Sequence, residues 1–581
     1  MGVAVGILNG WGLGLDVGLL AVYLALLYTA LFCPLLVLAG LGAVLVGRRP
    51  GRRAFVAGMV GGLLVFNALL RFQVAAQFVT DTPHMTLVGA VSLVGILACG
   101  IGAAAAVLAD DRRRRWRRAA AVVGGLALIW VVNTWQERPL YRDLATLVPS
   151  LLADTSVPPA PAPVPPEQAW PETRLVVLGF DGLSWEVLLE PLRSGELPGF
   201  RALLEDSAYG YVDTLPKVKV DAPLRWNLTW AETLSPVIWE TISTGKHPAE
   251  HGIGHFYQYR LPGISRGIWH VPTFSRGNGL MGLRIFLRQP PRWKTPWQRK
   301  PMSSADARMA RFYEVAERNG VSVGAFNWMN TGPAVPLNGF MRGKSLHKPR
   351  YYPPEIVDRL PPVPAGRPPK WYSIESTEER ERYERVLYDQ MVVMGREIPV
   401  ELMLYYTHFH DGTNHHLWKR EGQGDKFFFA GVGHPELDPS EVYMISLRLM
   451  DDIVADVLAR APDDAIVMVL SDHGFDWRQY KHHNAPPGLF IARGPGIEAG
   501  HHAGATVYDI APTLLHWLGL PVADDMPGSP LSVAIPGGPL DGPVLRVATH
   551  GSAKPAPSDG EMDPAELQKL EDELRALGYL N

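Results

Sequence analysis

The sequence predicts an α/β protein with a mostly parallel sheet sandwiched by helices, preceded by an N-terminal transmembrane helical region. Three observations predict this arrangement. Four apolar segments fill the first 140 residues, and charged residues are confined to the gaps between them. From Arg174 onward, short β-branched and apolar runs alternate with segments of helical periodicity. Acidic residues and histidines follow several of these runs, where open α/β sheets place their functional groups.

The four apolar segments each come close to the ~20 residues that a helix needs to cross a bilayer. They are residues 17–47, 54–70, 86–108 and 119–136. Arginine clusters follow the first segment, at 48–53, and the third, at 112–118, whereas residues 72–85 contain neither lysine nor arginine. The positive-inside rule makes both clusters cytoplasmic, so the N-terminus and everything after residue 140 are expected outside the cytoplasm. We therefore expect a multi-pass protein of the plasma (inner) membrane with an extracytoplasmic, periplasmic catalytic domain.

Length and composition limit the remaining choices. A chain of 581 residues is too long for one ordinary domain. A formal net charge of −3 offers no basis for nucleic acid binding, and none is expected. The two cysteines, Cys33 and Cys99, lie inside apolar segments, so neither a disulfide framework nor a zinc-thiolate site is predicted. No basic stretch precedes the first apolar segment, so a cleaved signal peptide is not expected.

Composition changes along the chain predict four parts. After the transmembrane region, 1–140, we expect a Pro-rich extracytoplasmic linker, 141–172, whose proline run is stiff enough to stand the next domain off the membrane. The catalytic domain is expected over 173–545, with an insertion of about 256–399 that shapes a substrate pocket. Residues 546–581 are expected to be a C-terminal tail with a short helix.

Within the catalytic domain, hydrophobic periodicity predicts the individual elements. Strands are expected at residues 175–180, 321–326, 400–406, 465–470 and 488–492. Helices are expected at residues 237–243, 303–319, 376–396 and 441–460.

Acids and histidines gather where these strands end. Asp181 follows the first strand, and Asp411 and His415 follow the third at a spacing that places both on one face of a helical turn. Asp472 and His473 follow the fourth strand directly, and His482 and His483 precede the last one. Aspartate together with neutral histidine suits a divalent ion such as Zn²⁺. The pattern therefore predicts a metal site at one edge of the sheet.

Ser235 stands at the start of a predicted helix, immediately before Pro236. A helix N-terminus favours an anion, which makes Ser235 a candidate nucleophile toward a phosphate; the alternative is a simple N-cap. Backbone N–H groups of that helix are expected to point toward the phosphate oxygens. Lys246, near the end of the same stretch, is either a further phosphate-binding group or a solvated surface lysine.

The successive motifs FDG, SPVIW with TGKHPAEHGI, DGTNH, SDHG and HHNAPPGLFIARGPGI resemble those of a known family. It is the type I phosphodiesterase/nucleotide pyrophosphatase family of the alkaline phosphatase superfamily, and the resemblance covers about residues 173–535. It implies an alkaline-phosphatase-like fold and a metal-dependent phosphoric ester hydrolase.

The resemblance also implies roles for individual residues. Two Zn²⁺ ions are expected, with other divalent ions such as Mn²⁺ as an alternative. One ion is implied at Asp181, Ser235, Asp472 and His473. The other is implied at Asp411, His415 and either His482 or His483, with a slight preference for His482. Ser235 is implied to be the nucleophile that forms a phosphoserine, although many family members carry threonine at this position; Thr233 is the less favoured alternative.

Several functions follow as hypotheses. We expect hydrolysis of a phosphodiester or phosphomonoester outside the cytoplasm, with a lipid- or nucleotide-linked phosphate ester as substrate and membrane lipid as a partner. The alternative is a transferase that moves a phospho-alcohol head group onto an envelope glycan or lipid. An inactive metal-binding module is disfavoured because neither the nucleophile nor any ligand position is missing. Sulfate ester cleavage is disfavoured because no C/S-x-P-x-R motif occurs.

Overall fold

The computed structural model describes residues 141–153, 169–215, 234–260, 263, 298–344, 350–364, 374–417, 419–420, 427–428, 439–475, 482 and 485–556. The four predicted membrane spans, most of the Pro-rich segment, Thr233, His483 and the chain after residue 556 lie outside this set. Within the set, no helix combines the length and the apolar character that crossing a membrane requires.

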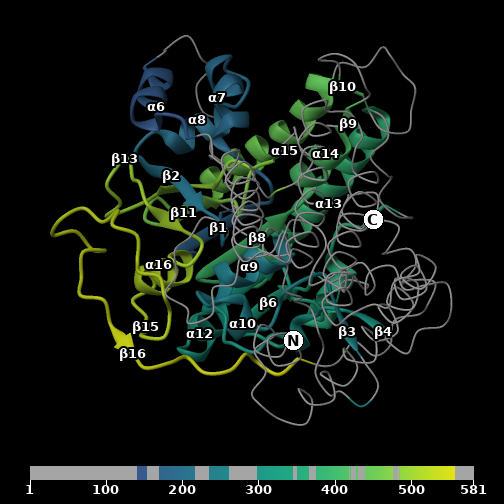
Figure 1. Ribbon diagram of the computed structural model, residues 1–581, viewed down its shortest axis with the longest axis vertical. Coiled ribbons are helices and arrows are strands. Elements are labelled where there is room, and N and C mark those ends of the chain that lie inside the picture. Colours follow the sequence, from purple (N-terminus) through teal and green to yellow (C-terminus); the bar gives the residue numbers. More distant parts are fainter. Residues whose placement is uncertain are drawn as a thin grey trace, which may run out of the picture.

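A ten-stranded sheet runs through the centre of the molecule (Figure 1). Its order is β13-β2-β12-β11-β1-β8-β5-β6-β7, and β14 pairs with β2. The strands are β1 Leu175–Phe180, β2 Ser207–Asp213, β5 Val323–Phe326, β6 Gly339–Arg342, β7 Tyr351–Tyr352, β8 Leu402–Thr407, β11 Ile466–Leu470, β12 Gly488–Arg493, β13 Gly500–His501 and β14 Ala505–Thr506. Short two-stranded pairs join β3 Tyr257–Arg260 to β4 Gln298–Pro301, β9 Lys419–Arg420 to β10 Phe427–Phe428, and β15 Val522–Ala523 to β16 Arg546–Val547.

The sheet is mixed, with a parallel centre. Strands β11, β1, β8, β5 and β6 run parallel to one another, whereas β12 is antiparallel to both of its neighbours, β11 and β2. The carboxyl ends of β1, β8 and β11 therefore meet at one edge. The sequence predicted that Asp181, Asp411 and Asp472 lie at this edge.

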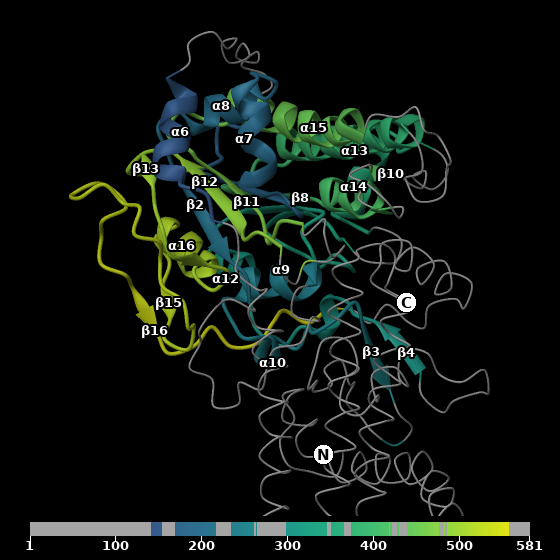
Figure 2. The ribbon, with the colours of Figure 1, turned by 45° about the horizontal axis from the view of Figure 1, so that its top comes forward.

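Helices cover both faces of the sheet (Figure 2). In β1, Leu175 and Val177 pack into one hydrophobic core while Val176, Leu178 and Phe180 pack into the other, which explains its continuous apolar run. On one face lie α6 Leu144–Leu152, α7 Trp185–Arg193, α8 Pro198–Leu204, α13 Ile374–Glu397, α14 Phe409–Leu417 and α15 Pro439–Arg460. On the other lie α9 Ser235–Thr244, α10 Pro248–His251, α12 Phe312–Arg318 and α16 Ile510–Trp517. Two 3₁₀ turns, η5 Ser304–Asp306 and η6 Pro354–Arg359, complete the described helices.

One predicted helix is wrong as a continuous element. The segment 303–319 divides into η5 and α12, because the residues between them are extended: Met309 forms an isolated β-bridge with Ser552, and Ala310 N donates to Gly551 O at 3.1 Å. This pairing with a distant segment overrides the local helical periodicity. Within the expected insertion, 256–399, strands β5, β6 and β7 belong to the main sheet.

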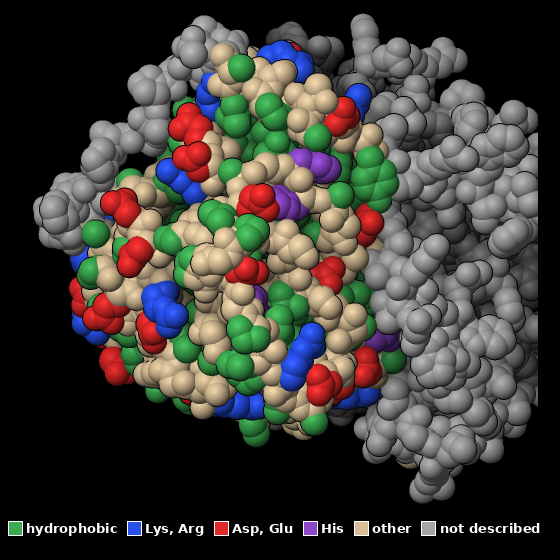
Figure 3. Space-filling model, turned by 90° about the vertical axis from the view of Figure 1, so that its left-hand side faces the viewer, with side chains coloured by type: hydrophobic (Ala, Val, Ile, Leu, Met, Phe, Trp, Pro, Cys, Tyr) green, Lys and Arg blue, Asp and Glu red, His purple; other side chains and the backbone are tan. Residues whose placement is uncertain are grey.

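The interval expected to be a linker contains a helix. α6 lies within residues 141–172, and its Leu144, Val148 and Leu151 are buried in the same hydrophobic core as α7 and α8. The side of the molecule that is on the left in Figure 1 mixes acidic, basic and hydrophobic side chains at its surface (Figure 3). Such a mixture is typical of a solvated face.

Candidate active site

Ser235 is the first residue of α9, and Leu234 before it is extended. Its side chain is 2% exposed. The hydroxyl donates a hydrogen bond to Asp181 Oδ1 at 3.1 Å, and its oxygen lies 3.3 Å from His473 Nε2. Because Leu234 occupies the N-cap position, Ser235 is not the N-cap, and its hydroxyl faces the acids and histidines at the sheet edge.

Asp181, Asp472 and His473 form a first cluster at the ends of β1 and β11, with one ligand atom of each within 4.8 Å of the others. His473 Nε2 lies 3.1 Å from Asp472 Oδ2 and 3.6 Å from Asp181 Oδ1. His473 Nδ1 lies 2.9 Å from the carbonyl oxygen of Gly474. Since a carbonyl only accepts, Nδ1 carries the proton and Nε2 presents its lone pair to the cluster.

Asp411, His415 and His482 form a second cluster of the same kind. Asp411 and His415 are one turn apart in α14, with Oδ2 and Nε2 separated by 3.5 Å. His482 Nε2 lies 3.1 Å from Asp411 Oδ1 and 2.9 Å from His415 Nε2. The rings of His482 and His473 stack at 3.8 Å and so join the two clusters. The other histidine considered for this position, His483, lies outside the described residues.

Gly182 allows the two clusters to approach each other. Its φ is +76°, and a Cβ at this position would lie 2.9 Å from Asp411 Cβ. Its N–H donates to Asp472 Oδ1 at 3.2 Å. The FDG motif therefore requires a glycine at this position, because of the positive φ and because a side chain would collide with Asp411.

The electrostatics of the site favour bound cations. Burial and the nearby Asp411 carboxylate raise the pKa of Asp181 to about 7, and burial together with Asp181 raises the pKa of Asp472 well above its usual value. Burial also opposes ionisation of Asp411, but His415 and His482 hold its pKa well below the usual range. Three buried carboxylates this close repel one another. Three carboxylates and three imidazoles with converging ligand atoms are a donor set that fits two Zn²⁺ ions.

Two residues beside the clusters have no signal in the sequence motifs. Tyr406, in β8, donates its hydroxyl to Asp181 Oδ2. Lys344, just after β6, places Nζ 4.3 Å from the centre of the Tyr406 ring and 2.7 Å from His408 Nδ1. Burial lowers the pKa of Lys344 to about 7. Tyr406 was recognisable only as the end of a predicted strand, and nothing local distinguishes Lys344.

Two expectations about α9 need correction. The N–H groups of Val237 and Ile238 both donate to Leu234 O, at 2.9 and 3.1 Å, and Pro236 has no N–H. These donors are directed into the helix rather than toward a phosphate oxygen. Lys246 follows the opposite end of α9; it is 2% exposed and pairs with Asp525, so it is not a solvated surface lysine and the structure does not place it among the clustered residues.

Comparison with known proteins identifies the family. The sequence profile described as "Type I phosphodiesterase / nucleotide pyrophosphatase" matches residues 175–486, which is more than half of the chain. The chain belongs to this family. This family is part of the alkaline phosphatase superfamily.

Similarities to individual proteins cover little of the chain or have low sequence identity. "Sulfatase ppz1" of Metarhizium majus (strain ARSEF 297) is 30% identical over 123 residues, 17% of this chain and 28% of that relative's length. A 2-O GAG sulfatase structure matches with 10% identity and a TM-score of 0.37, over 62% of this chain and 73% of that one. Murine ectonucleotide pyrophosphatase/phosphodiesterase 5 matches with 13% identity and a TM-score of 0.32, over 60% and 95%. Structural similarities with TM-scores this low do not indicate an activity for this chain.

Proposed function

We propose that the chain is a membrane-anchored two-zinc phosphohydrolase that cleaves phosphate diesters outside the cytoplasm through a phosphoserine at Ser235. The observation that carries the proposal is the position of Ser235 Oγ, 3.1 Å from Asp181 Oδ1 and 3.3 Å from His473 Nε2. The second donor cluster adjoins this one through the 3.8 Å stack of His473 and His482. Two donor sets this close suit two ions that share one phosphoryl group.

The two donor sets support an assignment of the metal ligands. Asp181, Ser235, Asp472 and His473 would hold one Zn²⁺. Asp411, His415 and His482 would hold the other. Bound there, the two ions supply Lewis acidity that lowers the pKa of the serine hydroxyl and neutralises charge on the phosphoryl oxygens.

The residues of the chain then account for a two-step displacement. Ser235 Oγ forms a bond to phosphorus as the bond from phosphorus to the leaving oxygen breaks, and the serine proton is transferred, in net terms, to the leaving alcohol. Water next attacks the phosphoserine, which releases the phosphorylated product and restores the serine hydroxyl. Asp181 accepts hydrogen bonds from both Ser235 and Tyr406, which orients its carboxylate against the nucleophile.

The membrane anchor and the compartment rest on the sequence. Four apolar segments and two intervening arginine clusters support a multi-pass anchor in the plasma (inner) membrane, with the catalytic domain extracytoplasmic. A reporter enzyme fused after Asn581 should be active only outside the cytoplasm. Reporter activity on the cytosolic side would contradict both the orientation and the compartment.

Turnover by the purified full-length protein in detergent tests the chemistry. Zinc-loaded protein should release p-nitrophenol from bis(p-nitrophenyl) phosphate, lose this activity in a chelator and regain it when Zn²⁺ is added back. p-Nitrophenyl phosphate, assayed in parallel, compares a monoester with a diester. If the zinc-loaded protein cleaved neither the diester nor the monoester, the proposed function would be contradicted.

A further inference from the structure

The segment that follows the predicted fourth membrane span is docked on the catalytic domain. In α6, Leu144, Val148 and Leu151 are buried at 0%, 0% and 6% exposure and lie on one face of the helix. Arg201, in α8, donates to the carbonyl oxygens of Leu151 and Leu152 at 2.7 and 2.9 Å. Because these two carbonyls lie in the last turn of α6, Arg201 ties the end of this helix to α8. α6 is therefore part of the catalytic body.

The chain reaches α6 at a defined place on that body. Tyr141 donates its hydroxyl to Asp213 Oδ1 at 2.5 Å, and its ring packs edge-on against Tyr211 with centroids 5.1 Å apart. The N–H of Arg142 donates to the hydroxyl oxygen of Tyr211 at 2.8 Å. Tyr211 in turn donates to Glu186 Oε1, in the first turn of α7, at 3.2 Å.

This docking place lies at the active-site edge of the sheet. β2 is antiparallel to β12, and β12 is antiparallel to β11, so β2 runs in the same direction as β11 and β1. Asp213, the last residue of β2, therefore lies at the same edge as Asp181 and Asp472. Three interstrand steps separate β2 from β1, which is roughly 14 Å across the sheet.

With the predicted anchor, only a short stretch of chain separates this edge from the bilayer. The fourth predicted span ends at residue 136, so residues 137–140 alone separate it from Tyr141. An extended chain covers at most about 18 Å over that interval. The Pro-rich run comes after α6 and joins it to Trp170. This residue is 2% exposed, and its backbone N–H donates to Arg460 O at 2.9 Å. Since both ends of that run belong to the catalytic body, it cannot act as a spacer from the membrane.

We propose that this docking holds the catalytic edge of the sheet close to the bilayer surface, so that the enzyme acts on phosphate esters whose alcohol is embedded in the membrane. The substrate class is a phosphodiester attached to a lipid chain and presented at the surface. Confinement to the same surface raises the effective concentration of such an ester at the site without any added contact. The inference rests on the proposed function, including its membrane anchor.

Two substrates with the same reacting group test the proposal. p-Nitrophenyl hexadecyl phosphate in phosphatidylcholine vesicles is a membrane-embedded ester, and p-nitrophenyl ethyl phosphate is its soluble counterpart. The full-length protein is reconstituted in the same vesicles. In one variant a helical insert of about 15 residues, roughly 22 Å long, is placed between Glu137 and Arg138. In the matched control the same insert is placed between Pro161 and Ala162, inside the run that begins and ends on the catalytic body.

The insert at 137–138 should lower kcat/KM for the hexadecyl ester about tenfold and leave that for the ethyl ester within about twofold. The insert at 161–162 should leave both values within about twofold. Equal kcat/KM for the hexadecyl ester in the two insertion variants, each active on the ethyl ester, would overturn the proposal. Failure of the parent protein to cleave either ester, or its removal from vesicles by alkaline carbonate, would instead contradict the proposed function.

Discussion

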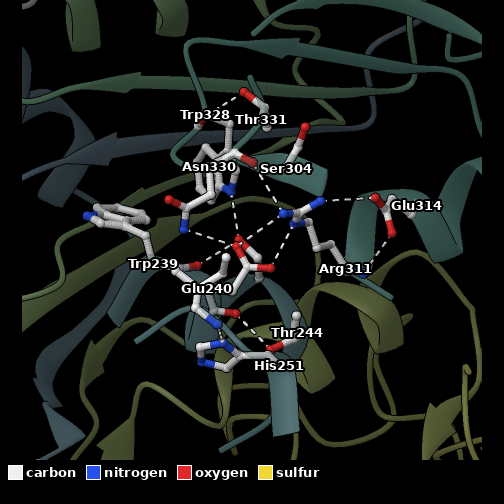
Figure 4. Close-up of polar contacts among 12 residues, drawn as sticks. Trp239, Glu240, Thr244, His251, Ser304, Arg311, Glu314, Trp328, Asn330 and Thr331 are labelled. Atoms are coloured by element: carbon white, nitrogen blue, oxygen red, sulfur yellow. Dashed lines mark hydrogen bonds and ion pairs between the residues drawn. The ribbon is translucent and has the colours of Figure 1, made fainter. Parts of the chain in front are cut away.

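Asn330 donates its side-chain N–H to the carbonyl oxygen of Pro236 at 2.8 Å and so binds the turn after β5 to the residue that follows the nucleophile. The same amide donates to Glu240 Oε2, one turn further along α9, at 3.0 Å (Figure 4). Asn330 has φ +62°, a left-handed conformation that asparagine adopts more readily than most residues. The first turn of α9 is thus held from outside the helix, at the position where Ser235 must stay aligned with Asp181.

Asn330→Gly should reduce both the turnover and the stability of the enzyme. Glycine keeps the left-handed backbone and removes only the two side-chain hydrogen bonds. We expect kcat to fall about tenfold with KM nearly unchanged, because Ser235 loses alignment rather than substrate affinity. The free energy of unfolding should fall by about 1–2 kcal/mol.

Asn327→Gly is the matched control for that variant. Asn327 also has a positive φ, +55°, and its side-chain oxygen accepts a hydrogen bond from Arg342, in β6. It should lose similar stability and keep its kcat. Equal losses of kcat in the two glycine variants would show that the loop as a whole, rather than the contact with Pro236, supports catalysis.

A buried ion pair anchors the same helix from the side. Arg311 donates to both carboxylate oxygens of Glu240, at 2.9 and 3.3 Å, and to Glu314 Oε1 at 3.2 Å (Figure 4). Arg311→Met would leave two carboxylates buried without their cation, so the free energy of unfolding should fall by about 3–5 kcal/mol. Urea unfolding measures the loss. Arg193→Met removes an exposed pair with Glu190 and should cost less than about 1 kcal/mol; a similar cost for both variants would contradict the assignment.

The charge at Asp181 should make the metal-free protein sensitive to pH. Burial and Asp411 raise the pKa of Asp181 from 3.8 to about 7, so the unfolded chain releases this proton first as the pH rises. The group therefore lowers stability progressively between about pH 4 and pH 7. Asp181→Asn should be more stable than the parent at pH 8 in a chelator, with the difference vanishing near pH 4. Thermal unfolding at several pH values checks this, and a difference that grows on acidification would contradict it.

Metal content should follow the two clusters. We expect close to two Zn²⁺ per chain in the purified protein. Asp411→Ala or His415→Ala should lose mainly one ion, and Asp472→Ala mainly the other, because each variant removes a ligand from only one donor set. Elemental analysis after dialysis measures the occupancy. Two Zn²⁺ per chain in all three variants would contradict the assignment. If His483→Ala lost more zinc than His482→Ala, the third ligand of the second cluster would be His483 instead of His482.

The central strands and most of the candidate site could be predicted because their signals are local. β1 is buried on both faces and is therefore apolar at every position, and Asp181 follows it in a short motif. The break between η5 and α12 could not be predicted, because it depends on pairing with Ser552, more than 200 residues away. β2 was missed because SAYGYVD mixes small and polar residues with few β-branched ones. The positions of Tyr406 and Lys344 beside the clusters could not be predicted, because they depend on β8 and β6 lying in the same sheet.

Every chemical step of the proposed mechanism depends on the hydroxyl of Ser235. Ser235→Ala should keep both zinc ions nearly intact, since Asp181, Asp472 and His473 still provide the first donor set. Turnover should fall by several orders of magnitude, because the two-step route is closed. Ser235→Thr should keep part of the activity, since it retains a hydroxyl and the added methyl group is the main penalty.

The covalent intermediate gives a readout that a structural role for Ser235 would not produce. Protein quenched during turnover of bis(p-nitrophenyl) phosphate should carry the phosphoryl ester on the peptide that contains Ser235, and mass spectrometry with fragmentation should place it on that residue. The adduct should be absent from Ser235→Ala. An adduct on Thr233, or full activity of Ser235→Ala, would show that the mechanism is wrong even where the metal assignment is right, because the hydroxyl that faces Asp181 and His473 would then not be the one that attacks phosphorus.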